Sequence, residues 1–212
     1  MPPRPTRLTR APVIALPAGP ITIAIRDWFV LLRPSLKLKP GKPAPELMRV
    51  PVKDAQTVLR GIIHLVADIT ATAPPTVVWV AGQDELLVLL DEVRIACAPG
   101  LVTISLFVQC EELRGDQRVD VAFAVGTPQQ PKGLVMSTFD RVSANRLIAD
   151  TWSGALTAFA WEALVTVAQQ LAAGMGTDAA KRPLVPGTIA SDTNLLLLGA
   201  MARSRVVPAG AQ

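Results

Sequence analysis

Apolar and polar residues alternate along much of the chain between residues 76 and 138, a pattern typical of strands that bury one face. In the run 101–110, for example, Val102 and every second residue after it are apolar or cysteine. Short links such as Ala98-Pro99-Gly100 separate these runs, and short links join antiparallel neighbours. The pattern predicts a β-meander with strands at 76–80, 85–90, 93–97, 101–110, 118–125 and 134–138. The run 85–90 is also compatible with a helical turn, and an earlier strand is expected from residue 21.

Helical periodicity of 3.6 residues replaces the alternation in two places, and a third helix is expected near the end of the sequence. One helix is expected from Asp54, as its N-cap, to about residue 70. A long helix is expected over 151–173, with Asp150 as its N-cap and glycines at positions 174 and 176 to end it. A short last helix is expected over 193–202, capped by Asp192.

The helix expected over 151–173 carries one charge, Glu162, and has almost no face suited to water. Trp152 and Phe159 lie on a broad apolar arc that suits a sheet. Glu162 lies on a narrow stripe that we expect at the solvent edge. A third side is made mostly of small residues, which allow close approach of a second surface belonging either to this chain or to a neighbouring subunit. The interface candidates on that side are Trp161, Val165 and Ala168.

A membrane span is the competing interpretation of this apolar helix, because its length would suffice. Glu162 lies near its middle, and a carboxylate there costs a few kcal/mol in lipid. Gln169 and Gln170 follow, and basic residues flank neither end. These features argue against a span.

Charge divides the chain, whose net charge is +4. Residues 1–53 hold ten Lys and Arg against two acidic residues, whereas the rest holds eleven against fifteen. A basic head can bind nucleic acid or the acidic body of another copy. Basic and aromatic residues are not interleaved, and no DNA-binding motif is present, so nucleic acid is the weaker expectation.

The same head suggests the domain organisation. Residues 1–20 contain many prolines and are expected to form an extended arm, which is either loose or ordered on a neighbouring subunit. Its candidate interface residues are Val13, Ile14 and Leu16. One domain is expected over 21–205, β-rich to residue 140 and helical from 141, followed by a loose tail at 206–212.

Residues suited to catalysis or metal binding are few. Cys97 and Cys110 lie too far apart along a predicted hairpin for a disulfide, which favours reduced thiols and a cytoplasmic location. His64 is the only histidine, so a zinc site and a histidine-based catalytic set lack their residues. Arg114-Gly115-Asp116 is expected to be a hairpin turn. We expect no metal and no cofactor, and an enzyme is the weaker hypothesis.

Together these patterns predict an α+β domain, an antiparallel meander with the long helix across it and the second helix beside it. The leading hypothesis is a structural protein that forms homo- or hetero-oligomers, as in a large bacterial or phage-like assembly. The alternative is a protein that binds a small lipid-like ligand between sheet and helix. Candidate cavity residues are Trp152, Phe159 and Phe123.

Overall fold

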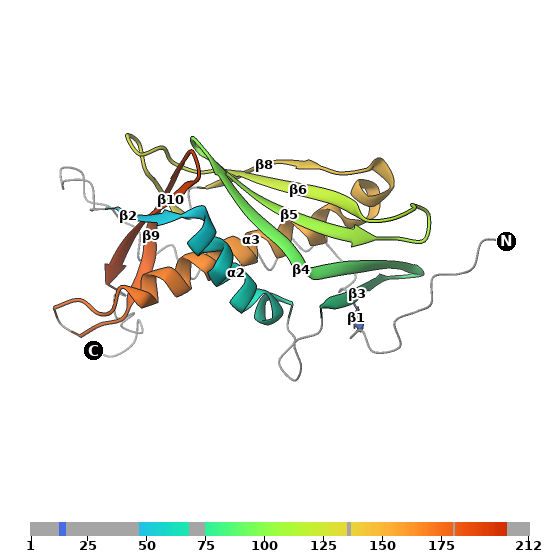
Figure 1. Cartoon of the computed structure of the whole chain (residues 1–212), viewed down its shortest axis with the longest axis horizontal. Coiled ribbons are helices and arrows are strands. Elements are labelled where there is room, and N and C mark those ends of the chain that lie inside the picture. Colours follow the sequence, from blue (N-terminus) through green and yellow to red (C-terminus); the bar gives the residue numbers. More distant parts are fainter. Residues whose placement is uncertain (1–12, 16–46, 68–74, 135–136, 180, 203–212) are drawn as a thin grey trace, which may run out of the picture.

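The computed structural model describes residues 13–15, 47–67, 75–134, 137–179 and 181–202. Within these residues the chain forms two helices and two sheets, so the predicted α+β class is confirmed (Figure 1). The strand order is β1-β3-β4-β5-β6-β8 in the large sheet and β2-β10-β9-β7 in the small sheet. The elements are β1 (Val13–Ala15), β2 (Met48–Pro51), α2 (Val52–Val66), β3 (Thr76–Ala81), β4 (Asp84–Ala98), β5 (Leu101–Gln109), β6 (Gln117–Ala124), β7 (Lys132–Gly133), β8 (Thr138–Ser143), α3 (Arg146–Gly174), β9 (Leu184–Asp192) and β10 (Leu195–Ala202).

The large sheet contains the meander that the alternation predicts. β3, β4, β5, β6 and β8 pair antiparallel in that order, and β1 adds a parallel strand beside β3. The runs 85–90 and 93–97 form the single strand β4, so the helical-turn alternative is wrong. Of the strand predicted at 134–138, only Thr138 lies in a strand, as the first residue of β8. Leu134 and Ser137 lie outside the strands, and residues 135–136 lie outside the described part of the chain.

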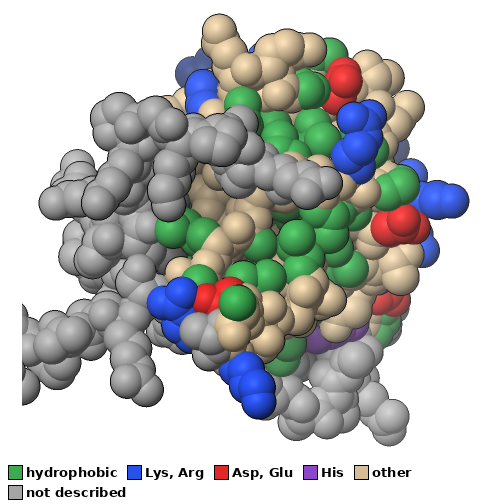
Figure 2. Space-filling model, turned by 90° about the vertical axis from the view of Figure 1, so that its left-hand side faces the viewer, with side chains coloured by type: hydrophobic (Ala, Val, Ile, Leu, Met, Phe, Trp, Pro, Cys, Tyr) green, Lys and Arg blue, Asp and Glu red, His purple; other side chains and the backbone are tan. Residues whose placement is uncertain are grey.

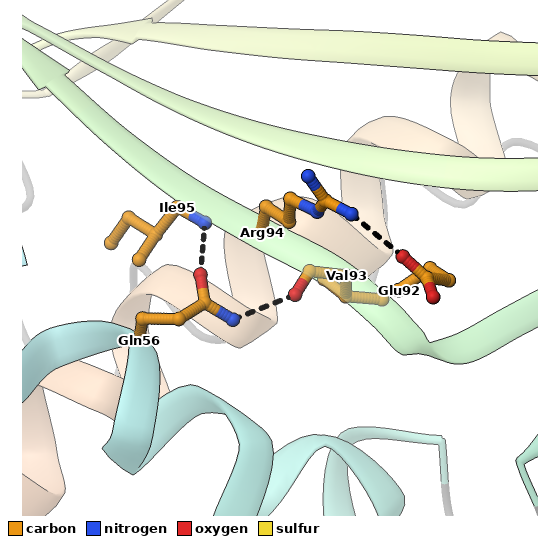
Figure 3. Close-up of polar contacts among 5 residues, drawn as sticks. All are labelled: Gln56, Glu92, Val93, Arg94 and Ile95. Atoms are coloured by element: carbon orange, nitrogen blue, oxygen red, sulfur yellow. Dashed lines mark hydrogen bonds and ion pairs between the residues drawn. The ribbon is translucent and has the colours of Figure 1, made fainter. Parts of the chain in front are cut away.

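β4 is irregular in its middle. Leu89 lies opposite Phe107 of β5, but the next paired residue of β4 is Arg94, opposite Ser105, so extra residues of β4 lie in between. β3 also stops pairing at Leu89. Beyond that residue the second edge of β4 faces α2 instead of a strand (Figures 1 and 3).

Gln56 of α2 completes the hydrogen bonding of this edge. Its Nε2 donates to the carbonyl oxygen of Val93 at 2.8 Å, and its Oε1 accepts from the amide of Ile95 at 2.8 Å (Figure 3). Val93 and Ile95 are buried. The side-chain amide therefore replaces the peptide group of a neighbouring strand, which satisfies a buried donor and a buried acceptor.

Both helices are present, but their predicted N-caps are wrong, whereas α3 ends at Gly174, one of the two glycines predicted to end it. α2 begins after Pro51, so Asp54 lies inside the first turn, where its charge suits the helix dipole. It ends at Val66, and residues 68–70 of the predicted helix lie outside the described part of the chain. α3 begins earlier than expected, because Asn145 is the N-cap and its Oδ1 accepts from the amide of Leu147 at 3.0 Å. Asp150 instead lies one turn inside α3.

The last predicted helix, 193–202, is wrong: the chain forms strand β10 there, in a hairpin with β9. Asn194 has a φ of 56° at the turn, a left-handed conformation that asparagine tolerates. Four consecutive leucines at 195–198 carry no period that separates helix from strand. Pairing with β9 and β2 decides the conformation, so the described residues of the region 141–205 are helical only over Arg146–Gly174.

α3 is buried along most of its circumference by two sheets and a helix of its own chain. It contacts β5, β6 and β8 of the large sheet, α2, and β9 and β10 of the small sheet. The rings of Phe159 and Trp79 lie 5.4 Å apart, and those of Trp161 and Phe123 lie 5.3 Å apart. The second surface that the sequence left open is therefore provided by this chain.

The two sheets meet at Gly126 and Ser191. Ser191 donates its amide to the carbonyl oxygen of Gly126 at 2.9 Å and its hydroxyl to that of Ala98 at 2.7 Å. The amide of Gly126 donates to the carbonyl oxygen of Ile189 at 3.3 Å. The amide of Gly100 donates to the carbonyl oxygen of Ser191 at 3.1 Å. The ends of β4, β5 and β6 are thereby joined to the hairpin of β9 and β10.

Candidate protein-docking surface

The large sheet has an inner face, which α2 and α3 cover, and an outer face on its other side (Figure 1). Residues directly opposite each other in antiparallel strands point to the same face. The register therefore places the buried residues Val88, Val108, Ile104 and Val121 on the inner face. Residues between them in sequence belong to the outer face. No described helix or strand covers that face (Figure 1).

The outer face carries a band of large apolar side chains on β3, β4 and β5. Val78 lies opposite Leu87, and Leu89 lies opposite Phe107. All of them are half-buried. The members of this apolar band are Val78, Val80, Leu87, Leu89 and Phe107.

Next to the apolar band lies a polar row whose charges are paired within the face. The hydroxyl of Ser105 donates to Oδ1 of Asp120 at 2.6 Å, and Nε of Arg118 donates to the same oxygen at 2.8 Å. Arg94 pairs with Glu92 at 2.8 Å. The Arg94 guanidinium also lies 5.3 Å from the centre of the Phe107 ring.

Ser105 lacks the neighbour that would activate it as a nucleophile. Ser105 is buried and hydrogen-bonded to a carboxylate, without a histidine beside it to act as a general base. His64, the only histidine, lies half-buried in the last turn of α2, on the other side of the sheet. Within the described ranges no group of three or more His, Cys, Asp or Glu residues could hold a metal ion.

A second apolar surface lies at the end of the molecule that carries the small sheet. Figure 2 shows apolar side chains gathered at the centre of this end, with Lys and Arg at its margin. The partly exposed apolar residues of the small sheet include Met48, Leu184, Val185, Leu195 and Met201.

Most interface residues predicted from the sequence do not lie on either surface. The candidates on α3, Trp161, Val165 and Ala168, are buried in the protein's own core, with 6%, 2% and 0% of their surfaces exposed. Their predicted role as contacts to another subunit does not fit this position. Val13 and Ile14 lie in β1, paired with β3 of the same chain. Leu16 and the rest of the predicted arm lie outside the described residues.

The candidate cavity residues are part of the core as well. Trp152, Phe159 and Phe123 are at most 6% exposed. Phe159 contacts the ring of Trp79, and Phe123 contacts that of Trp161. Side chains of the protein thus occupy the space around two of these three rings.

Two smaller predictions are confirmed. Glu162 is exposed, as expected for the solvent edge of α3. The segment from Arg114 to Asp116 is the turn between β5 and β6, with a φ of 70° at Gly115. Nε2 of Gln109 donates to Oδ1 of Asp116 at 2.6 Å, which ties this turn to β5.

The apolar band could have been recognised from the sequence, because two of its strands do not alternate between apolar and polar residues. Residues 77–80 and 86–90 are apolar at nearly every position, not at every second one. Such runs are typical of strands whose two faces are both covered. Here described elements cover only one face.

Cys97 and Cys110 are both free thiols, as predicted. Burial raises the pKa of Cys97 to about 12 from an ordinary value of about 9. Burial, together with a hydrogen bond to Glu112, also raises the pKa of Cys110.

Between pH 9 and 12, therefore, folded Cys97 keeps a proton that the unfolded chain loses. We expect the free energy of unfolding to fall with rising pH by up to about 1.4 kcal/mol per unit from this thiol, and no contribution below pH 9. Urea unfolding of the wild type and Cys97→Ala across this range checks the prediction. The difference between the two proteins should narrow as pH rises, and a constant difference would contradict it.

Comparisons place the chain in no known group. No family model matches it, and no curated protein or solved structure matches it either. Within the described residues no helix is both long and apolar enough to cross a membrane.

Proposed function

We propose that the protein is a non-enzymatic structural or assembly subunit that binds other protein subunits, of its own kind or another, through the outer face of the large sheet. The observation that supports this most is the apolar band on β3, β4 and β5. Contiguous apolar surface that the described elements leave partly open is typical of protein interaction sites.

The charges of this face favour a protein partner over nucleic acid. Arg118 is paired with Asp120, and Arg94 is paired with Glu92. Binding to phosphates would require Lys and Arg whose charge is available to the ligand. An apolar centre beside a polar row that carries both signs is instead the composition of a protein interface.

Replacing Phe107 or Leu87 with glutamate tests the proposal. We expect either change to remove the protein from its assembly, because a charge in the apolar band would have to be buried against the partner. The measurement is chemical crosslinking followed by mass spectrometry of intact complexes, with the full chain isolated from cells that make it. Stoichiometric protein partners should be lost from both variants.

Leu65→Glu is the matched control. Leu65 is 57% exposed on α2, away from the outer face, so the same change in charge should leave the assembly intact. If the outer-face variants and the control retain the same partners, the outer face is not the binding surface. If the wild type has no protein partner at all, the proposed function itself is wrong.

A further inference from the structure

Among the described strands, β8 is the last at one edge of the large sheet (Figure 1). Five of its six side chains are exposed, and Phe139 has 51% of its surface open to solvent. An edge strand presents unpaired backbone donors and acceptors that another strand can use. The edge is therefore suited to accept a strand, and the residues of β8 indicate which one.

An extra residue in β8 brings its two apolar side chains to one face. Phe139 lies opposite Phe123 and Val142 lies opposite Val121, both on the inner face, whereas Asp140 has no partner in β6. In a regular strand, residues three positions apart point to opposite faces. The bulge at Asp140 adds one residue between Phe139 and Val142, so both point to the same face. The remaining residues, Thr138, Arg141 and Ser143, lie opposite outer-face residues of β6.

We propose that β8 pairs antiparallel with β8 of a second copy of this chain, about a two-fold axis between Asp140 and Arg141. A two-fold axis normal to the sheet reverses the strand and keeps every side chain on its own face. Phe139 then lies opposite Val142 of the other copy, both on the inner face. Thr138 lies opposite Ser143, and Asp140 lies opposite Arg141.

All three contacts join side chains that attract each other. Apolar, hydroxyl and opposite-charge pairs are the cross-strand pairs that stabilise antiparallel strands. The match of Phe139 with Val142 depends on the bulge, since without it the two would point to opposite faces. The pairing also covers Phe139, the exposed aromatic residue of this edge.

Bulges and charged residues on edge strands commonly prevent pairing with another chain, and β8 has both a bulge and two charged residues. A protective edge carries charges that meet like charges when two copies approach. Here Asp140 and Arg141 are adjacent and of opposite sign, and they already form an ion pair at 2.6 Å. In the dimer each would meet its opposite charge on the other copy, so the charges favour this one register.

Charge reversal tests the register directly. Asp140→Arg and Arg141→Asp each place like charges at both contacts, so each variant alone is expected to be monomeric at concentrations where the wild type is a dimer. An equimolar mixture of the two should form a heterodimer, because every contact again joins opposite charges. The double variant D140R/R141D should dimerise by itself. Sedimentation velocity and native mass spectrometry distinguish these species.

The mixture separates pairing from any effect on folding, since two damaged monomers would not repair each other. Circular dichroism of each variant checks the fold, and Leu65→Glu serves as the distant control that should dimerise normally. A wild type that stays monomeric up to about 0.1 mM, or a mixture without heterodimer, overturns the inference.

This inference goes beyond the proposed function, because it assigns a second copy of the chain to the β8 edge of the large sheet and not to its outer face. The two can fail separately. A monomeric wild type that still binds another protein through Phe107 would leave the proposed function intact and remove only the β8 dimer.

Discussion

Replacing Gln56 with leucine is expected to lower the free energy of unfolding by about 2–4 kcal/mol. The change removes both hydrogen bonds to β4 and leaves the carbonyl of Val93 and the amide of Ile95 without their partner in a buried place. Unsatisfied buried groups cost more than the loss of an exposed hydrogen bond. Urea unfolding followed by circular dichroism measures the effect, with Arg60→Leu, an exposed position of α2, as the control.

Gln56→Glu makes the test specific. An ionised carboxylate can accept from Ile95 but places a second oxygen against the carbonyl of Val93. The protonated acid has one donor and one acceptor, like the amide. We therefore expect this variant to be destabilised at pH 7 and to recover relative to the wild type as pH falls through the raised pKa of the introduced carboxyl group. Equal free energies of unfolding of the two proteins at pH 7 would show that the two hydrogen bonds of Gln56 to β4 contribute little to stability.

Gly126→Ala is expected to cost about 3 kcal/mol or more, or to prevent folding. A Cβ atom at this position would lie 2.3 Å from the backbone nitrogen of Lys132 and 2.6 Å from Cα of Pro131. These are backbone atoms of a loop that folds back onto the glycine, so no side chain can move aside. The same residue joins the two sheets through Ile189 and Ser191, which makes a local shift costly.

Gly154→Ala is the matched control and should have the opposite sign. Gly154 lies exposed within α3, and a Cβ there would meet nothing within 4 Å. Alanine favours a helix over glycine by about 0.5–1 kcal/mol, so this variant should gain stability. The midpoints of thermal and urea unfolding report both changes. Similar midpoints for the two variants would rule out the steric argument at the junction.

Local patterns were sufficient for much of the large sheet and for the existence of both helices. Alternation identifies β5 and β6 almost to the residue, because a half-buried strand must alternate. The caps were harder to predict. Asp150 and Asn145 are both good N-cap residues, and the sequence alone does not choose between them; in the structure Asn145 is the N-cap.

The candidate surface was less accessible from the sequence than the fold. From the side of α3 that is made mostly of small residues, the sequence predicted that Trp161 contacts a second surface. Trp161 does contact such a surface, but it belongs to the same chain. Periodicity shows which sides of a helix are apolar, but it does not show whether the same chain or another subunit buries them. The apolar residues left partly open lie on the sheet instead, at Leu87, Leu89 and Phe107.

By itself the sequence determined the α+β class, the antiparallel meander, the burial of α3 and the exposure of Glu162, because each follows from the spacing of apolar and polar residues along one element. The tertiary structure alone decided the conformation of the leucines at 195–198, the hydrogen bonds of Gln56 to β4 and the bulge at Asp140. These three depend on partners distant in the chain, whose backbone donors, acceptors and apolar surfaces no local pattern can specify.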